Sequence, residues 1–187
     1  MAPIPTLQSL ATACKRFGPG RLPRADQREL GAGYAGAAAA VSIAVVYALA
    51  TTVVYLLGVT HDFVHPFWSA SALVAVPFVV PAAFLVAAAV WRYLPDRTPF
   101  FGAVAGALAT VLTYAFALVL VFLTLLVVLA VGGTGTGIET TTELLEVASM
   151  LTVVIGIFAV ILTGWLTIPI GCLSGTIYER ARAVPVR

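Results

Sequence analysis

The longest apolar stretch of this chain, from Phe100 to Val131, constrains the fold more than any other feature. No charged residue occurs between Thr98 and Ile138. A membrane hydrocarbon core of about 30 Å is crossed by about 20 residues of helix, at about 1.5 Å per residue. The stretch exceeds that length, and a soluble domain of this size has no core that would enclose it. It therefore predicts a membrane-spanning helix that tilts to fit the bilayer.

Composition places the whole chain in the same class. Of its 187 residues, 61% are hydrophobic and 10% are charged, whereas soluble domains carry about 25% charged residues. Three other apolar segments have spanning length, so we predict an all-α integral membrane protein, a four-transmembrane-helix bundle. The expected spans are about 31–59, 69–93, 99–132 and 144–176, within a membrane domain of residues 26–178. A basic segment, 1–25, precedes this domain, and a tail, 179–187, follows it.

The first 25 residues do not resemble a secretory signal, because their positive charges come late and the following apolar run is too long. Apolar residues recur at helical spacing at Leu7, Leu10, Ala11, Cys14 and Phe17. This pattern predicts a short helix on the membrane surface, and a disordered basic tail is the alternative. Cys14 and Cys172 both fall on the side that we expect to be cytoplasmic, so no disulfide is expected.

Local signals mark the starts of the first and last spans. Asp26 and Glu29 stand three residues apart, so that one can cap the first turn while the other reaches back. Thr140 and Glu143 have the same spacing before the last apolar run.

Three prolines predict bends inside the spans. Pro77 and Pro81 fall in the second span and Pro169 in the fourth. Each removes a backbone donor and crowds the carbonyl four residues earlier, so both helices should kink. Prolines are frequent in membrane helices, which favours an architectural role over a gate.

Small and hydroxyl residues follow one face of the third span and one face of the fourth. In the third span they are Gly102, Gly106, Thr110, Thr113, Ala117 and Thr124. In the fourth they are Thr152, Gly156, Ala159, Thr163, Thr167, Gly171 and Gly175. Faces of this kind let helices approach closely, so we expect the two spans to pack together. The alternative is that the threonine rows line a polar path.

The basic residues predict the orientation in the membrane. All ten Lys and Arg residues fall in the N-terminal segment, the turn at 92–97 and the C-terminal tail. With four spans, these three places share one side, and the two loops on the other side hold no basic residue. The positive-inside rule makes the basic side cytoplasmic, with both termini inside the cell membrane. The near-absence of lysine and the lack of asparagine favour a GC-rich prokaryotic genome.

One outer loop holds the only candidate metal ligands that we find, His61, Asp62 and His65. On a helix, the two imidazoles would share a face, as a metal site requires. The loop lacks a third convincing ligand, although Glu139, Glu143 or Glu146 would supply one if the two outer loops met. Polar residues at a membrane interface are the favoured interpretation, and Glu143 and Glu146 suit a helix N-terminus.

Absent features narrow the function further. No ionisable residue lies near the middle of a span, which disfavours proton relays and ion-coupled transport. No haem, phosphate-loop or nucleophile motif occurs, so we expect no cofactor.

We therefore predict a non-enzymatic subunit or scaffold that acts through helix packing. Its expected partners are the lipid bilayer and either further copies of itself or another membrane protein, with no nucleic acid. The first alternative is a small oligomeric transporter or channel that uses the threonine faces and the Pro77 and Pro81 kink. An enzyme acting at the outer surface through His61, Asp62 and His65 is the least favoured class.

Overall fold

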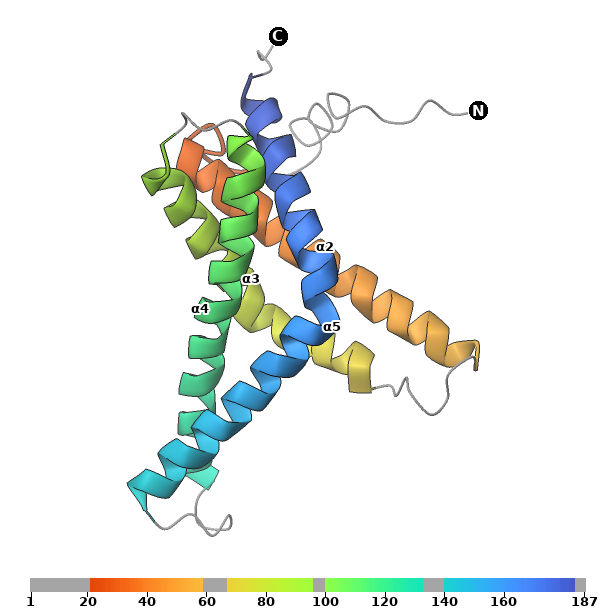
Figure 1. Ribbon diagram of the computed structural model, residues 1–187, viewed down its shortest axis with the longest axis vertical. Coiled ribbons are helices and arrows are strands. Elements are labelled where there is room, and N and C mark those ends of the chain that lie inside the picture. Colours follow the sequence, from red (N-terminus) through yellow and green to blue (C-terminus); the bar gives the residue numbers. More distant parts are fainter. Residues whose placement is uncertain (1–20, 59–66, 96–99, 133–139, 184–187) are drawn as a thin grey trace.

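The computed structural model describes residues 21–58, 67–95, 100–132 and 140–183. These residues contain four α-helices and no strand: α2 (Arg28–Leu56), α3 (Phe67–Tyr93), α4 (Phe101–Gly132) and α5 (Thr141–Ala183) (Figure 1). Each helix is long and apolar enough to cross a membrane. The prediction of an all-α fold with four membrane-spanning helices is confirmed. The predicted surface helix, between positions 7 and 17, lies outside the described residues.

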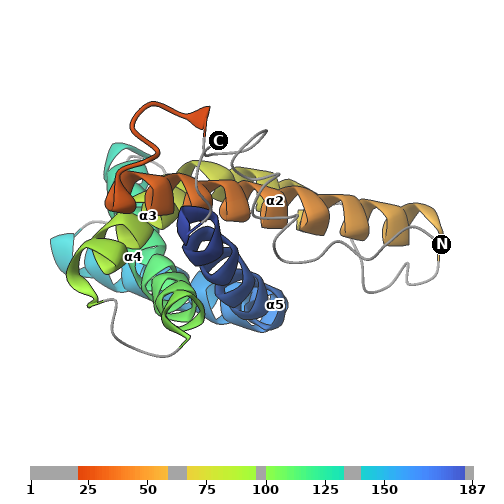
Figure 2. The ribbon, with the colours of Figure 1, turned by 90° about the horizontal axis from the view of Figure 1, so that it is seen from above.

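The helices form two antiparallel hairpins, α2 with α3 and α4 with α5. The hairpins meet where α2 and α4 begin and α3 and α5 end, and we call this the joined end. Away from it they diverge, so that the far end of α2 lies well apart from the far ends of α4 and α5 (Figures 1 and 2). We call this opposite side the open end.

Backbone glycines bring α4 and α5 together. A Cβ atom built on Gly106 would overlap the carbonyl oxygen of Gly171, and one built on Gly175 would overlap that of Gly102. Farther along, a Cβ on Gly156 would lie 2.9 Å from the Leu118 side chain. The two small-residue faces therefore lie against each other, at a separation that only glycine permits.

Small residues also bring α2 and α3 together. A Cβ on Gly33 would lie 2.9 Å from the ring of Phe84, and one on Gly36 would lie 2.9 Å from the Cβ of Ala87. The ring of Tyr34 packs against Phe84, with centroids 5.3 Å apart. The glycine- and alanine-rich first half of α2 is thus its contact surface with α3.

α5 is longer than the sequence pattern predicts. It contains 43 residues, about 65 Å at about 1.5 Å per residue, and extends seven residues beyond the expected end at position 176. Residues 177–183 hold Arg, Glu and Ala, which favour helix, and no glycine or proline. Part of the segment that we expected to be a separate tail, 179–187, is therefore the last turns of α5.

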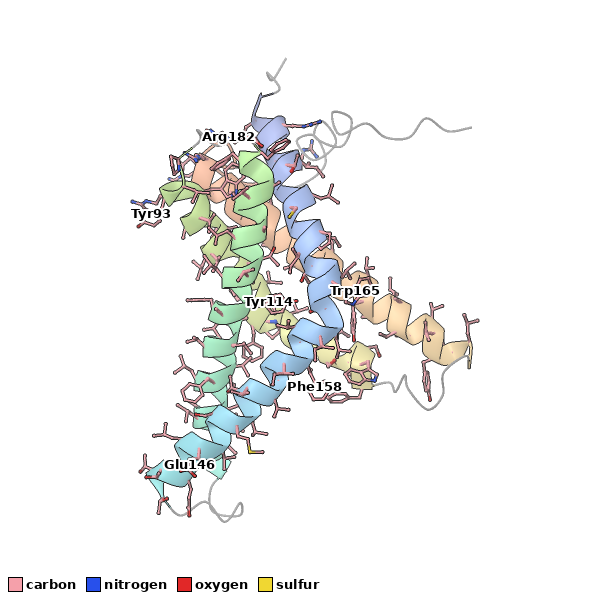
Figure 3. The ribbon with its side chains drawn as sticks, in the orientation of Figure 1. Tyr93, Tyr114, Glu146, Phe158, Trp165 and Arg182 are labelled. Carbon is pink, nitrogen blue, oxygen red and sulfur yellow. The ribbon has the colours of Figure 1, made fainter. Side chains whose placement is uncertain are left out.

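All three interior prolines lie within continuous helices. α3 continues through Pro77 and Pro81. α5 changes direction close to Trp165, one turn before Pro169 (Figure 3). Pro169 has no N–H to bond the Trp165 carbonyl, which accounts for a bend at this place.

The two predicted helix starts have different outcomes. In α5, the Thr140 N–H donates to Glu143 Oε2 at 3.1 Å and the Glu143 N–H donates to Thr140 Oγ1 at 3.2 Å, so the capping box is confirmed. The expected cap from Asp26 and Glu29 is wrong. The N-cap of α2 is Gln27, which makes no side-chain capping bond. Glu29 instead faces Arg92, as described below.

The surface of the described residues is apolar and their core is small. Most of the buried residues are alanines and glycines, and no polar or charged residue among those described is fully buried. Large apolar side chains such as Leu56, Val131 and Ile161 remain mostly exposed. Such a surface suits contact with lipid chains. Inside a bilayer, moving an apolar side chain from lipid to a helix contact gains little free energy, because both surroundings are apolar.

The glycine contacts predict a position-specific effect on stability. Gly106→Ala should lower the free energy of unfolding by about 1–3 kcal/mol, because the new methyl group overlaps the Gly171 backbone. Thermal unfolding of the purified protein in mild detergent measures this change. Gly164→Ala is the matched control, since its Cβ would meet only Val160, at 3.6 Å. Equal effects of the two substitutions would contradict the close approach of α4 and α5.

Candidate functional site

Three aromatic rings from three helices meet at the joined end. Trp91 of α3 packs edge-on against Phe101 of α4 and against Tyr178 of α5, with both pairs of centroids 4.8 Å apart. The three side chains are the largest buried ones among the described residues. Edge-to-face pairs of this kind add about 0.5–1.5 kcal/mol each beyond the area they bury. We call these three rings, together with Arg28, the four-helix junction.

Arg28 brings the first turn of α2 into this junction. Its guanidinium lies 5.4 Å from the centroid of Phe101 and 6.0 Å from that of Trp91. Its Nη2 also donates a 2.7 Å hydrogen bond to the Leu94 carbonyl, just after α3. The charge is therefore held by ring faces and a carbonyl, in a setting where cation–π attraction is strengthened by partial removal of water.

Tyr178 and Glu179 attach α5 to the first turns of two other helices. The Tyr178 hydroxyl donates to the Arg28 carbonyl at 2.8 Å. It lies directly over Gly31, where a Cβ would overlap it. Glu179 Oε2 accepts a 2.9 Å bond from the Gly102 N–H. That N–H belongs to the first turn of α4, where no carbonyl of the helix is available and negative charge is favoured.

An ion pair lies on the outside of the junction. Arg92 Nε lies 3.9 Å from Glu29 Oε2, and both side chains are substantially exposed. Exposed pairs of this length contribute at most about 1 kcal/mol. The junction thus depends mainly on its aromatic rings and on the hydrogen bonds of Arg28, Tyr178 and Glu179.

A second polar group, the hydroxyl cluster, lies midway along the contact between α4 and α5. The Tyr114 hydroxyl is 2.6 Å from Thr163 Oγ1 and 2.9 Å from Thr167 Oγ1. Thr163 donates its own proton to the Ala159 carbonyl at 2.7 Å. Thr163 therefore accepts from Tyr114, which leaves Tyr114 to accept from Thr167. The cluster lies close to the bend of α5 (Figure 3).

The other predicted threonines bond to their own helices. The hydroxyl groups donate to backbone carbonyls one turn earlier: Thr110 to Gly106 at 2.9 Å, Thr113 to Ala109 at 2.7 Å and Thr152 to Ala148 at 2.7 Å. Thr110 also packs directly on Gly171. Hydroxyl groups bonded in this way satisfy themselves locally and offer little to a passing solute.

Thr124 lies away from the contact between α4 and α5. It lines an open groove between α3 and α4, with Pro77, Phe78, Leu120, Leu123, Val127 and Val128. A second groove between the same helices has only apolar side chains around it: Val86, Ala89, Val90, Leu112, Ala115, Phe116 and Val119. Both grooves suit hydrocarbon chains or an apolar helix.

The predicted metal ligands His61, Asp62, His65 and Glu139 lie outside the described residues. Glu143 takes part in the cap of α5, and Glu146 is exposed near the start of α5, at the open end (Figure 3). This part of α5 lies well apart from the helix ends that flank 59–66 (Figure 1). The described part of the chain contains no cluster of three His, Cys, Asp or Glu residues that would hold a metal ion.

Sequence patterns alone did not point to the partners that form both polar groups. Tyr178 and Glu179 lie just after the expected end of the last span, and Arg28 entered only as one of the basic residues that predict the orientation. Neither Trp91 nor Tyr114 belongs to a motif. A signal existed for Arg28 and Trp91, since each stands where a charged segment meets an apolar one, a place typical of interfacial contacts. Tyr114 carried the weaker signal of a hydroxyl beside the small-residue face.

No protein-family model, curated protein or solved structure matches this chain.

The junction predicts a specific role for one hydroxyl group. Tyr178→Phe keeps the ring contacts and loses the bond to the Arg28 carbonyl, so the free energy of unfolding should fall by about 0.6–2 kcal/mol. Thermal unfolding in detergent tests this, with Tyr93→Phe as the control because Tyr93 is 78% exposed. An unchanged Tyr178→Phe protein would show that the bond does not stabilise the fold.

Proposed function

We propose that this chain is a non-enzymatic, multi-pass membrane protein that serves as a subunit or scaffold. The observation that carries the proposal is the use made of its polar groups. At the junction and in the hydroxyl cluster, they connect one helix to another. Groups occupied in this way stabilise an arrangement of helices and are not presented to a substrate.

The remaining surface supports the same proposal. The small-residue faces of α4 and α5 cover each other, so a partner would contact larger apolar side chains, such as those along the two grooves between α3 and α4. Shape complementarity and dispersion would have to supply the affinity, because lipid competes equally for apolar surface.

The proposal includes an orientation. The described arginines all lie at the joined end or on the turn that precedes α2, whereas Glu143 and Glu146 lie at the open end. With the positive-inside rule, the joined end faces the cytoplasm. Cysteine labelling of intact cells tests this assignment: a reagent that cannot cross the membrane should label Glu146→Cys and spare Arg182→Cys.

A small transporter or channel remains the second candidate, because one observation favours it. The hydroxyl cluster lies beside the bend of α5, where a helix that straightened would expose Tyr114, Thr163 and Thr167. Against it, those hydroxyls bond to one another, and the two grooves between α3 and α4 are lined by apolar side chains apart from Thr124.

Two variants separate the candidates. We expect Tyr114→Phe and Thr163→Val to lower the free energy of unfolding by no more than about 2 kcal/mol each and to leave assembly with a partner unchanged. A pore or carrier that uses these hydroxyls would instead lose flux in liposomes while its unfolding temperature stayed close to that of the wild type.

The direct test is purification from the native membrane in mild detergent, with mass and composition read together. A complex heavier than the 19.5 kDa chain that holds a second protein at fixed stoichiometry supports the subunit. A homo-oligomer without another protein, together with solute flux after reconstitution, would replace this proposal with transport.

A further inference from the structure

The exposed arginines at the joined end form the most strongly charged surface of the described residues. Its exposed members are Arg21 and Arg24 before α2, Arg92 at the end of α3, and Arg180 and Arg182 at the end of α5. We call this set the arginine rim. With Arg28, the described residues here include six arginines against three carboxylates, Asp26, Glu29 and Glu179, an excess of three positive charges.

Two of the three carboxylates are already occupied. Glu29 faces Arg92, and Glu179 accepts from the Gly102 N–H. Asp26 is exposed in the same turn as Arg24. The excess of positive charge is therefore carried mainly by Arg21, Arg24, Arg180 and Arg182, which are exposed.

The structure brings the arginines before α2 and those at the end of α5 together around Tyr178. A Cβ on Gly31 would overlap both the Tyr178 hydroxyl and the carbonyl oxygen of Ala25, so the turn that holds Arg24 lies against the end of α5. Arg182 follows Tyr178 by one helical turn, and it lies within electrostatic range of the Tyr178 hydroxyl. Arginines that are far apart in the sequence thus share one surface.

Hydrogen bonds hold the turn that carries Arg21 and Arg24 in a defined shape. The Ala25 N–H donates to the Leu22 carbonyl at 3.1 Å, and the Gln27 N–H donates to the Arg24 carbonyl at 3.0 Å. The Tyr34 hydroxyl donates to the Pro23 carbonyl at 3.4 Å, which holds the turn against α2. Arg24 itself has a φ of 58°, a left-handed conformation that costs about 1 kcal/mol or more outside glycine.

Large apolar side chains lie next to this charge. Leu22 is 45% exposed, Tyr93 is 78% exposed and Phe100 is 83% exposed. Leu22 precedes α2, Tyr93 ends α3 and Phe100 precedes α4, so all three lie near helix ends at the joined end. A ligand that fits such a surface has an anionic head and an apolar body. A free phosphate ion would use only the arginines, whereas a phospholipid would use both.

We propose that the arginine rim binds the headgroups of anionic phospholipids. Guanidinium groups suit phosphate because they offer paired donors in one plane and stay charged. Basic clusters immediately outside the membrane attract anionic lipid by about 1 kcal/mol per residue, or about fivefold in affinity for each arginine. The proposal does not depend on whether the chain is a subunit or a transporter.

The test uses the full-length protein, stripped of lipid in detergent and incubated with phosphatidylglycerol or phosphatidylcholine of identical acyl chains. Native mass spectrometry measures how much of each lipid stays bound. We expect the wild-type protein to retain phosphatidylglycerol at least about tenfold more tightly, given about fivefold for each arginine engaged. Equal retention of the two lipids would overturn the proposal.

A combined variant tests the residues. Arg21→Gln, Arg24→Asn, Arg180→Gln and Arg182→Gln together should reduce the preference for phosphatidylglycerol to less than about twofold, because the two remaining arginines no longer outnumber the three carboxylates. Asparagine is chosen at position 24 because it tolerates the left-handed conformation. Circular dichroism and the unfolding temperature confirm that the variant folds, and an undiminished preference in a folded variant would overturn the proposal.

Two controls sharpen the result. Replacing the same four arginines with lysine keeps the charge, so most of the preference should return; a loss as large as that of the uncharged variant, in a folded protein, would overturn the assignment of the preference to the excess positive charge. Glycerol phosphate at constant ionic strength should not displace the lipid. Displacement at matched concentration would assign the surface to soluble anions and overturn the lipid assignment.

Discussion

The close approach of α4 and α5 is the constraint on which the rest of the structure depends. It exists because Gly102, Gly106, Gly171 and Gly175 carry no Cβ atom, and because these glycines recur at the spacing of one helix face. In a membrane, where lipid removes most of the hydrophobic incentive for helices to associate, backbone proximity and dispersion become the main attraction. The approach also fixes the register of the two helices, which places Glu179 at the first turn of α4.

That register determines the four-helix junction. With α5 fixed on α4, Tyr178 meets Trp91 of α3 and the Arg28 carbonyl of α2, so one short segment of α5 contacts the other three helices. Nothing comparable joins the hairpins at the open end of the described structure, where they diverge. The molecule is therefore held together at one membrane face, and its apolar surfaces elsewhere are left to lipid or to a partner. This asymmetry is consistent with the proposed role as a subunit or scaffold, which rests on polar groups that connect one helix to another.

The same asymmetry concentrates positive charge. The junction contains helix ends from all four helices, and the arginines that flank those ends share its outer surface. Arg28 points inward and is held by rings and a carbonyl, whereas Arg24 and Arg182 are exposed. One set of residues thus stabilises the fold while the neighbouring set is available to anionic headgroups. Tyr178, which stabilises the fold, and Arg182, which we propose to bind lipid headgroups, lie only one helical turn apart on α5.

The sequence by itself determined the number, type and apolar character of the helices, since spanning length and the lack of charge leave few other structures in reach. It also determined the Thr140–Glu143 cap, a signal that acts over three residues. Only the tertiary structure decided which side chains meet across helices. Arg28 and Tyr178 are 150 residues apart, and their contact depends on two hairpins crossing at a particular angle, which no local pattern encodes. For the same reason, Glu29 lies opposite Arg92 and does not cap its own helix. A local capping preference is thus not realised where tertiary packing directs the side chain to another helix.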